Sequence, residues 1–164
     1  MKNVGNLTVT LPSDREIALA RSFNAPRHLV FKALTTPDLL RQWLAGPPGW
    51  TMDVCDIDLR VGGTYRFVWR GPDGSEMGMG GVYLEVVVPE RYSGTEKFDR
   101  PWHDGEVIAT TVLTERGEQT DLTITVRYDS PEIRDAVLQS PMAEGMSYGY
   151  DRLAELLATM EVVQ

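Results

Sequence analysis

Residues 140–160 read SPMAEGMSYGYDRLAELLATM, and this stretch decides the fold class. The Ser140-Pro141 pair predicts the start of a helix, because the residue before a proline avoids the helical region. From there the apolar positions recur at intervals of four, four, three, four and three residues: Met142, Met146, Tyr150, Leu153, Leu157 and Met160. This spacing is typical of one apolar stripe along an α-helix. A helix of this length spans about 30 Å, so it can cross a small domain, and its stripe needs a second layer to cover it.

The covering layer is predicted upstream, where residues 50–129 contain strands and turns. Tyr65, Phe67 and Trp69 recur at a period of two, which indicates one face of a strand. Residues 71–74, Gly-Pro-Asp-Gly, are a turn signal between this strand and the next. Short connections between consecutive strands favour an antiparallel meander, since parallel pairs need long crossovers.

The same signals predict further strands and one irregularity. The expected strands cover residues 15–23, 77–88, 91–98, 107–113 and 122–128. The Gly80-Gly81 pair lies inside one of them and predicts a bulge where the strand bends. A bulge there would change which side chains face the helix.

Two short helices are predicted between Pro26 and Ala45. Residues 24–26 and 36–38 each place a proline where a helix begins, and there its missing N–H costs nothing. The cluster Gly-Pro-Pro-Gly at 46–49 ends the second helix.

The composition is that of an ordinary globular chain. Of 164 residues, 42% are apolar and 24% are charged, so we expect a single domain over residues 1–164. The net charge of −8 argues against nucleic acid and membrane surfaces as partners. The single cysteine, Cys55, cannot form an internal disulfide, and residues 1–16 lack the apolar segment of a signal peptide. We therefore expect a cytoplasmic protein.

Several short motifs follow one another in an order found in one superfamily. They are Ala25-Pro26, Leu40 with Trp43, Asp58-Leu59-Arg60-Val61-Gly62-Gly63, Gly81-Val82-Tyr83-Leu84-Glu85-Val86 and Gly145-Met146. Over about residues 15–158 the chain resembles the START-like, pollen-allergen-like (SRPBCC) superfamily, and within it the branch named after the activator of the heat-shock-protein-90 ATPase. The resemblance implies an α+β helix-grip fold: a curved antiparallel sheet of seven strands, two short helices and a long C-terminal helix that encloses an apolar cavity with the sheet.

Aromatic and methionine side chains are the candidate lining of that cavity. Methionines adapt their shape, and rings with polar tips suit the wall of an apolar pocket. The set consists of Trp43, Tyr65, Phe67, Trp69, Met77, Met79, Tyr83, Met142, Met146 and Tyr150. We expect it to bind a small hydrophobic or aromatic molecule, with no cofactor and no assigned catalytic residue.

Two other functions are compatible with the resemblance. One is a co-chaperone-like module that docks on a chaperone or on a second copy of the chain. The eukaryotic activator carries a separate N-terminal domain, so we expect no stimulation of the chaperone's ATPase by this chain alone. The other is an enzyme of the polyketide-cyclase kind, which would use polar groups in the cavity for proton transfer. The sequence leaves the question of catalysis open.

The remaining motifs give only weak indications of a catalytic or metal-binding site. Residues 145–149 match the nucleophile pattern G-x-S-x-G, but they lie inside the striped helix and no histidine follows them. His28, His103 and Cys55 are too far apart for a metal-ligand pair, so no metal is expected. Aspartates at 53, 56 and 58 are interpreted as solvated or arginine-paired strand residues. His103, beside Trp102 in a loop, is the candidate acid or base at a cavity mouth.

Overall fold

The computed structural model describes residues 2–101 and 105–160. Its strands are β1 (Lys2–Val4), β2 (Leu7–Thr10), β3 (Glu16–Phe23), β4 (Thr51–Ile57), β5 (Thr64–Arg70), β6 (Glu76–Val87), β7 (Arg91–Thr95), β8 (Lys97–Phe98), β9 (Ile108–Arg116) and β10 (Gln119–Arg127). Its helices are α1 (Arg27–Thr35), α2 (Pro37–Trp43), α3 (Pro131–Leu138) and α4 (Met142–Thr159). The two short helices and the long terminal helix are confirmed.

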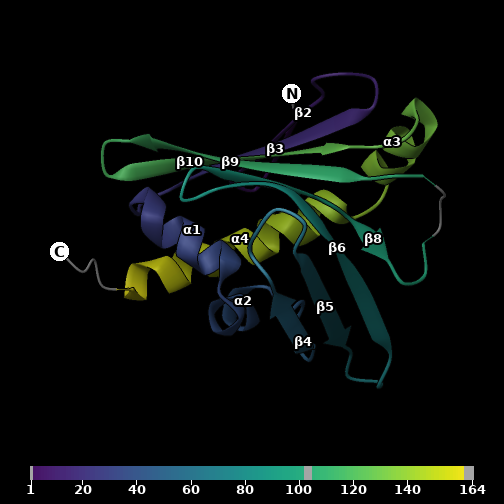
Figure 1. Ribbon diagram of the computed structural model, residues 1–164, viewed down its shortest axis with the longest axis horizontal. Helices are drawn as coiled ribbons and strands as arrows, with labels where there is room; N and C mark the ends of the chain where they lie inside the picture. The colour runs from purple at the N-terminus through teal and green to yellow at the C-terminus, as the bar shows by residue number, and fades with distance from the viewer. Residues whose placement is uncertain (1, 102–104, 161–164) are drawn as a thin grey trace.

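All strand pairs are antiparallel, in the order β1-β2-β3-β10-β9-β7-β6-β5-β4, and β8 pairs with β6. Figure 1 shows a sheet with two wings: β3, β10 and β9 form one, and β4, β5 and β6 form the other at a steep angle. Helix α4 runs along the concave side between them. The helix-grip expectation is therefore confirmed.

The described part of the chain has ten strands where seven were expected. The β1-β2 hairpin was missed, and the strand expected over residues 91–98 is divided into β7 and β8. The division has a physical reason: β7 pairs with one half of β6 through Gly94 opposite Tyr83, whereas β8 pairs with the other half through Phe98 opposite Met79.

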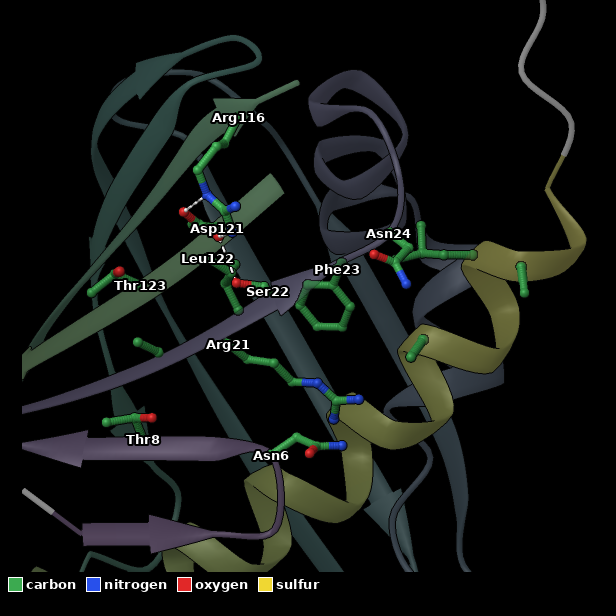
Figure 2. A pocket seen from close by; sticks show the side chains of 14 residues that line it. Asn6, Thr8, Arg21, Ser22, Phe23, Asn24, Arg116, Asp121, Leu122 and Thr123 are labelled. Carbon is green, nitrogen blue, oxygen red and sulfur yellow. Dashed lines mark hydrogen bonds and ion pairs between the residues drawn. The ribbon is translucent and has the colours of Figure 1, made fainter. Parts of the chain in front are cut away.

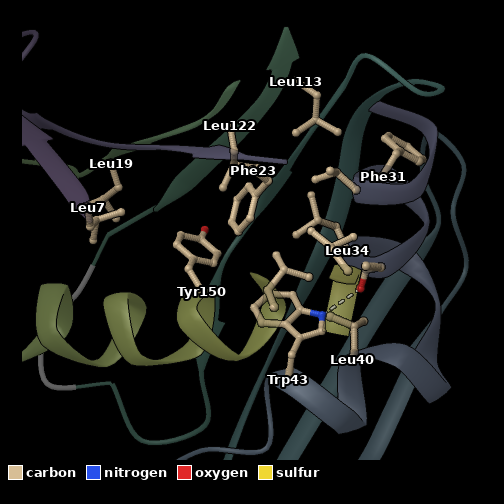
Figure 3. Close-up of a cluster of buried hydrophobic side chains, with 14 of the residues drawn as sticks. Leu7, Leu19, Phe23, Phe31, Leu34, Leu40, Trp43, Leu113, Leu122 and Tyr150 are labelled. Carbon is tan, nitrogen blue, oxygen red and sulfur yellow. Dashed lines mark hydrogen bonds between the residues drawn. The ribbon is translucent and has the colours of Figure 1, made fainter. Parts of the chain in front are cut away.

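The core lies between α4 and the sheet. Tyr150, Leu153 and Leu157 are buried on the helix, which confirms the direction of its apolar stripe. Figure 3 shows the ring of Tyr150 beside Phe23 and Trp43, with leucines from the sheet and from α1 and α2 around them. The indole Nε1 of Trp43 donates a hydrogen bond to the Ala33 carbonyl at 2.9 Å, which ties the second short helix to the first.

The bulge predicted at Gly80-Gly81 is wrong. Strand β6 continues through both glycines in register with β5, and the register shifts between Tyr83 and Glu85 instead. The glycines are needed for close approach: a Cβ at Gly81 would overlap the carbonyl oxygen of Thr95, and one at Gly80 would lie 2.6 Å from the carbonyl oxygen of Tyr65.

Gly145 and Gly149, the two glycines of α4, do not allow another part of the chain to approach the helix backbone closely. A Cβ at Gly145 would meet no heavy atom within 4 Å outside its own surroundings in the helix, and one at Gly149 would make only ordinary contacts of 3.9 Å with Trp43. Among the described residues, no helix combines the length and the hydropathy needed to cross a bilayer.

Candidate functional site

A row of aromatic rings runs along the inner face of the β4-β5-β6 wing. Tyr65 and Phe67 have ring centroids 5.3 Å apart, Phe67 and Trp69 5.9 Å, and Tyr65 and Tyr83 5.4 Å. The prediction that Tyr65, Phe67 and Trp69 share one face is confirmed. We call Tyr65, Phe67, Trp69 and Tyr83 the inner aromatic row.

The methionines of β6 lie on the same face as this row. Met79 pairs directly with Phe67, and Met77 pairs with Trp69, and directly opposite residues of a ladder point to the same side. Trp69 is buried, and its indole Nε1 donates a hydrogen bond at 2.6 Å to the carbonyl of Leu44, just after α2. Met77 is 45% exposed near the start of β6, so it lies at the margin of the row.

The residues of α4 that were predicted to line the cavity lie in two different surroundings, the core and a small hollow near β2. Tyr150 is only 2% exposed and packs in the core, with its ring 5.9 Å from Phe23 and 5.9 Å from Trp43. Met142 lines a hollow of about 30 Å³ with Val9 of β2, away from β5. Met146, one turn further along α4, is partly buried against the core.

The structure adds side chains that the sequence interpretation passed over. Tyr92 of β7 extends the row, with its ring 6.3 Å from Tyr83 and 5.8 Å from Phe31 of α1. Burial raises the pKa of Tyr92 to about 12, although a hydrogen bond with the Thr111 side chain lowers it somewhat. The alternation of side chains along residues 91–95 was the sequence signal that could have predicted which way Tyr92 faces.

Glu96 is the second overlooked residue, and it follows the last residue of β7. It is half-buried, and desolvation raises the pKa of its carboxyl group above the usual range of glutamate. The nearby hydroxyl of Tyr65 donates a hydrogen bond to the Thr95 carbonyl at 2.7 Å. The inner face therefore carries polar groups beside its rings.

A large hollow in the described part of the chain lies away from the inner aromatic row. It measures about 790 Å³ and lies where β3 extends past the end of β2, against the last turns of α4. Figure 2 shows its lining side chains. They are Asn6, Thr8, Ala20, Arg21, Ser22, Phe23, Asn24, Arg116, Asp121, Leu122, Thr123, Ala154, Leu157 and Ala158. None of them belongs to the predicted cavity wall.

This groove is built from paired charges. The side chain of Arg21 is 8% exposed, and its Nη1 lies 2.6 Å from Asp151 of α4. Arg116 and Ser22 both donate to Asp121, and these bonds lower the pKa of Asp121 to about 2. The charges that line the groove are thus largely satisfied within the protein.

Two aspartates of the acidic cluster at residues 53–58, in and just after β4, pair with arginines. Asp53 lies 3.0 Å from Arg70, and Asp58 lies 2.9 Å from Arg60. Within residues 2–101 and 105–160, no three His, Cys, Asp or Glu side chains come together as a potential metal site. Trp102 and His103 lie outside the described residues.

Ser147 lies within α4, buried, with its hydroxyl next to Gly5 of the β1-β2 turn. It has neither the strand-to-helix turn nor the following histidine that activates a serine nucleophile. We expect Ser147→Ala to leave any hydrolysis of p-nitrophenyl acetate unchanged, and a fluorophosphonate probe to leave Ser147 unlabelled. Stoichiometric labelling of Ser147 in a peptide map would contradict this.

The chain is similar to one protein family and to several solved structures. Residues 24–158 match the family described as activator of Hsp90 ATPase homolog 1-like protein. A Rhodobacter sphaeroides crystal structure is 34% identical, with a TM-score of 0.87 over 94% of this chain and 100% of that chain. A Nitrosomonas europaea structure is 28% identical, with a TM-score of 0.79 over 90% and 97% of the two chains. A Mycobacterium smegmatis structure is 26% identical, with a TM-score of 0.81 over 95% and 99%. No curated protein matches.

Proposed function

This chain belongs to the family of activator of Hsp90 ATPase homolog 1-like proteins, and from that premise we propose that it binds a small hydrophobic or aromatic molecule between the inner aromatic row and α4. Proteins of this family and superfamily commonly bind hydrophobic ligands. The proposal assigns no reaction to the chain.

One observation carries the proposal: apolar side chains on the inner face of the β4-β5-β6 wing are incompletely buried. Phe67 and Met79, which pair across β5 and β6, are both only partly buried, and so is Met146 of α4. In a closed core such side chains pack without leaving accessible surface. Apolar surface that stays accessible inside a fold gives an apolar ligand something to cover.

The expected binding affinity follows from the apolar area that a ligand would bury. Burial contributes about 25 cal/mol per Å² of apolar surface, and association costs several kcal/mol. A two-ring aromatic compound that hides a few hundred Å² is therefore expected to bind with a dissociation constant on the order of 100 µM. We choose 2-naphthylmethanol as a neutral probe of this size.

Met146→Trp is expected to weaken binding of 2-naphthylmethanol at least about tenfold, because the indole would occupy the space left for the ligand. The free energy of unfolding should change by less than the ~1–3 kcal/mol that overpacking costs in a closed core. Isothermal titration calorimetry gives the affinity, and urea unfolding gives the stability.

Met142→Trp is the matched control, since Met142 lies one turn earlier on α4 but next to Val9. It should leave the affinity unchanged. A Met146→Trp protein that is strongly destabilised and yet binds the probe normally would show that Met146 is ordinary core. A wild-type protein that binds no apolar probe would refute the proposed function.

A further inference from the structure

Glu96 points to the inner face of the sheet. The ring contacts of Tyr92 with Phe31 and Tyr83 place Tyr92 on that face, and successive side chains of a strand alternate. Gly94 and Glu96 therefore follow Tyr92 on the same side. The extended backbone continues as far as Glu96, whose N–H donates to the Val107 carbonyl at 2.9 Å.

Two tyrosines lie around the carboxyl group of Glu96. The ring of Tyr65 passes over Gly94, where a Cβ would stand 3.7 Å from its Cε1 atom, and its hydroxyl bonds to the neighbouring Thr95 carbonyl. Burial raises the pKa of Tyr65 and of Tyr128, and the nearby charge of Glu96 adds to both rises. The carboxyl group is thus within electrostatic reach of both hydroxyls, next to the inner aromatic row.

This carboxyl group has no cationic partner in the described part of the chain. None of the ion pairs there involves Glu96, and burial is the cause of its raised pKa. Burying a carboxylate away from water without a partner is costly. By contrast, Arg21 in the large groove is already neutralised by Asp151.

Resting on the proposed ligand-binding function, we infer that the ligand is a hydrophobic amine, whose protonated nitrogen pairs with the carboxylate of Glu96 while its apolar body covers Phe67 and Met79. Three features favour a cation over a neutral or anionic group. An ion pair gains strength away from bulk water. The faces of Tyr65 and Tyr83 attract a cation through their ring quadrupoles. The net charge of −8 repels anions from the whole molecule.

The test compares three probes that share one apolar body: 2-naphthylmethylamine, 2-naphthylmethanol and 2-naphthoate. Calorimetric titration of the wild-type protein should show the amine binding about tenfold or more tightly than the alcohol, the gain of a charge-assisted hydrogen bond. The carboxylate should bind more weakly than the alcohol. In Glu96→Gln the amine should lose its advantage, whereas the affinity of the alcohol should stay within about twofold.

Glu118→Gln is the control, because it removes the same charge from an exposed turn between β9 and β10. It should preserve the preference for the amine. If the alcohol binds but the amine binds no better, or if Glu96→Gln retains the preference, the inference about Glu96 is wrong and the proposed function stands. If none of the three probes binds the wild-type protein, both fail. If Glu96→Gln does not fold, the affinities of the three probes for the wild-type protein still test the inference.

Discussion

Truncation of Tyr150 to alanine is expected to lower the free energy of unfolding by about 3–5 kcal/mol, the range measured for large aromatic side chains in cores. Tyr150 is 2% exposed, and its ring packs against Phe23 of β3 and Trp43 of α2. The substitution would leave a cavity at the point where the helix, the sheet and the short helices meet. Equilibrium unfolding in urea measures the loss.

Glu155→Ala provides the reference for this measurement, because Glu155 is exposed on the same helix. Its effect should stay within about 0.5 kcal/mol, as for ordinary surface sites. If Tyr150→Ala cost no more than Glu155→Ala, Tyr150 could not be part of the core described for α4.

The second large effect is expected at Gly81, where alanine should destabilise the protein by about 1–3 kcal/mol through overpacking. The added methyl group would overlap the carbonyl oxygen of Thr95, and backbone atoms cannot give way as a flexible side chain can. Two hydrogen bonds would be disturbed with it. The N–H of Val82 donates to Thr95 Oγ1 at 2.9 Å, and the hydroxyl of Tyr65 donates to the Thr95 carbonyl at 2.7 Å.

The same substitution at Gly145 should have the opposite sign. Gly145 lies in the interior of α4, and a Cβ there would meet nothing within 4 Å, so alanine should stabilise the helix by up to about 1 kcal/mol. Thermal or urea unfolding of both variants gives the comparison. A neutral Gly81→Ala would mean that β6 and β7 are not as close at this point as the structure has them.

The elements with strong periodicity were predictable from the sequence. The stripe on α4 and the alternation of Tyr65, Phe67 and Trp69 identified the helix, the strand and the faces that both bury. The β1-β2 hairpin was missed because its strands have only three and four residues, too few for alternation to stand out from chance. The split between β7 and β8 depends on which half of β6 each one pairs with, and local sequence does not encode that choice.

Gly80 and Gly81 show why a glycine pair that was correctly noticed in the sequence led to the wrong prediction of a bulge. A glycine pair in a strand marks either a bulge or a close approach of another backbone, and sequence alone does not separate the two. In β6 the glycines allow a close approach, because the backbone of Thr95 lies against Gly81. The pair therefore leaves the parity of the strand intact, so Met79 still shares the face of Phe67.

The candidate site was predictable in its strands and less so in its helix. Neighbours within a sheet follow from alternation, whereas the partner of each turn of α4 depends on how the helix crosses the sheet. Met142 and Tyr150 share one stripe, yet one faces β2 and the other the core. Glu96 was overlooked because a charged residue in a strand normally faces solvent. Its inward direction became apparent only from the contacts of Tyr92 and Tyr65.

The binding site itself is tested most directly by the methyl resonances of the methionines, recorded on protein labelled with [methyl-¹³C]methionine during titration with 2-naphthylmethanol. A ring that lies on the inner aromatic row should shift the methyl signals of Met79 and Met146 saturably, with one common dissociation constant. The signals of Met142 and Met160 should stay in place. Saturable shifts at Met160 alone, two residues beyond Ala158 of the large groove, would place the ligand outside the sheet's inner face, and unchanged spectra would contradict binding altogether.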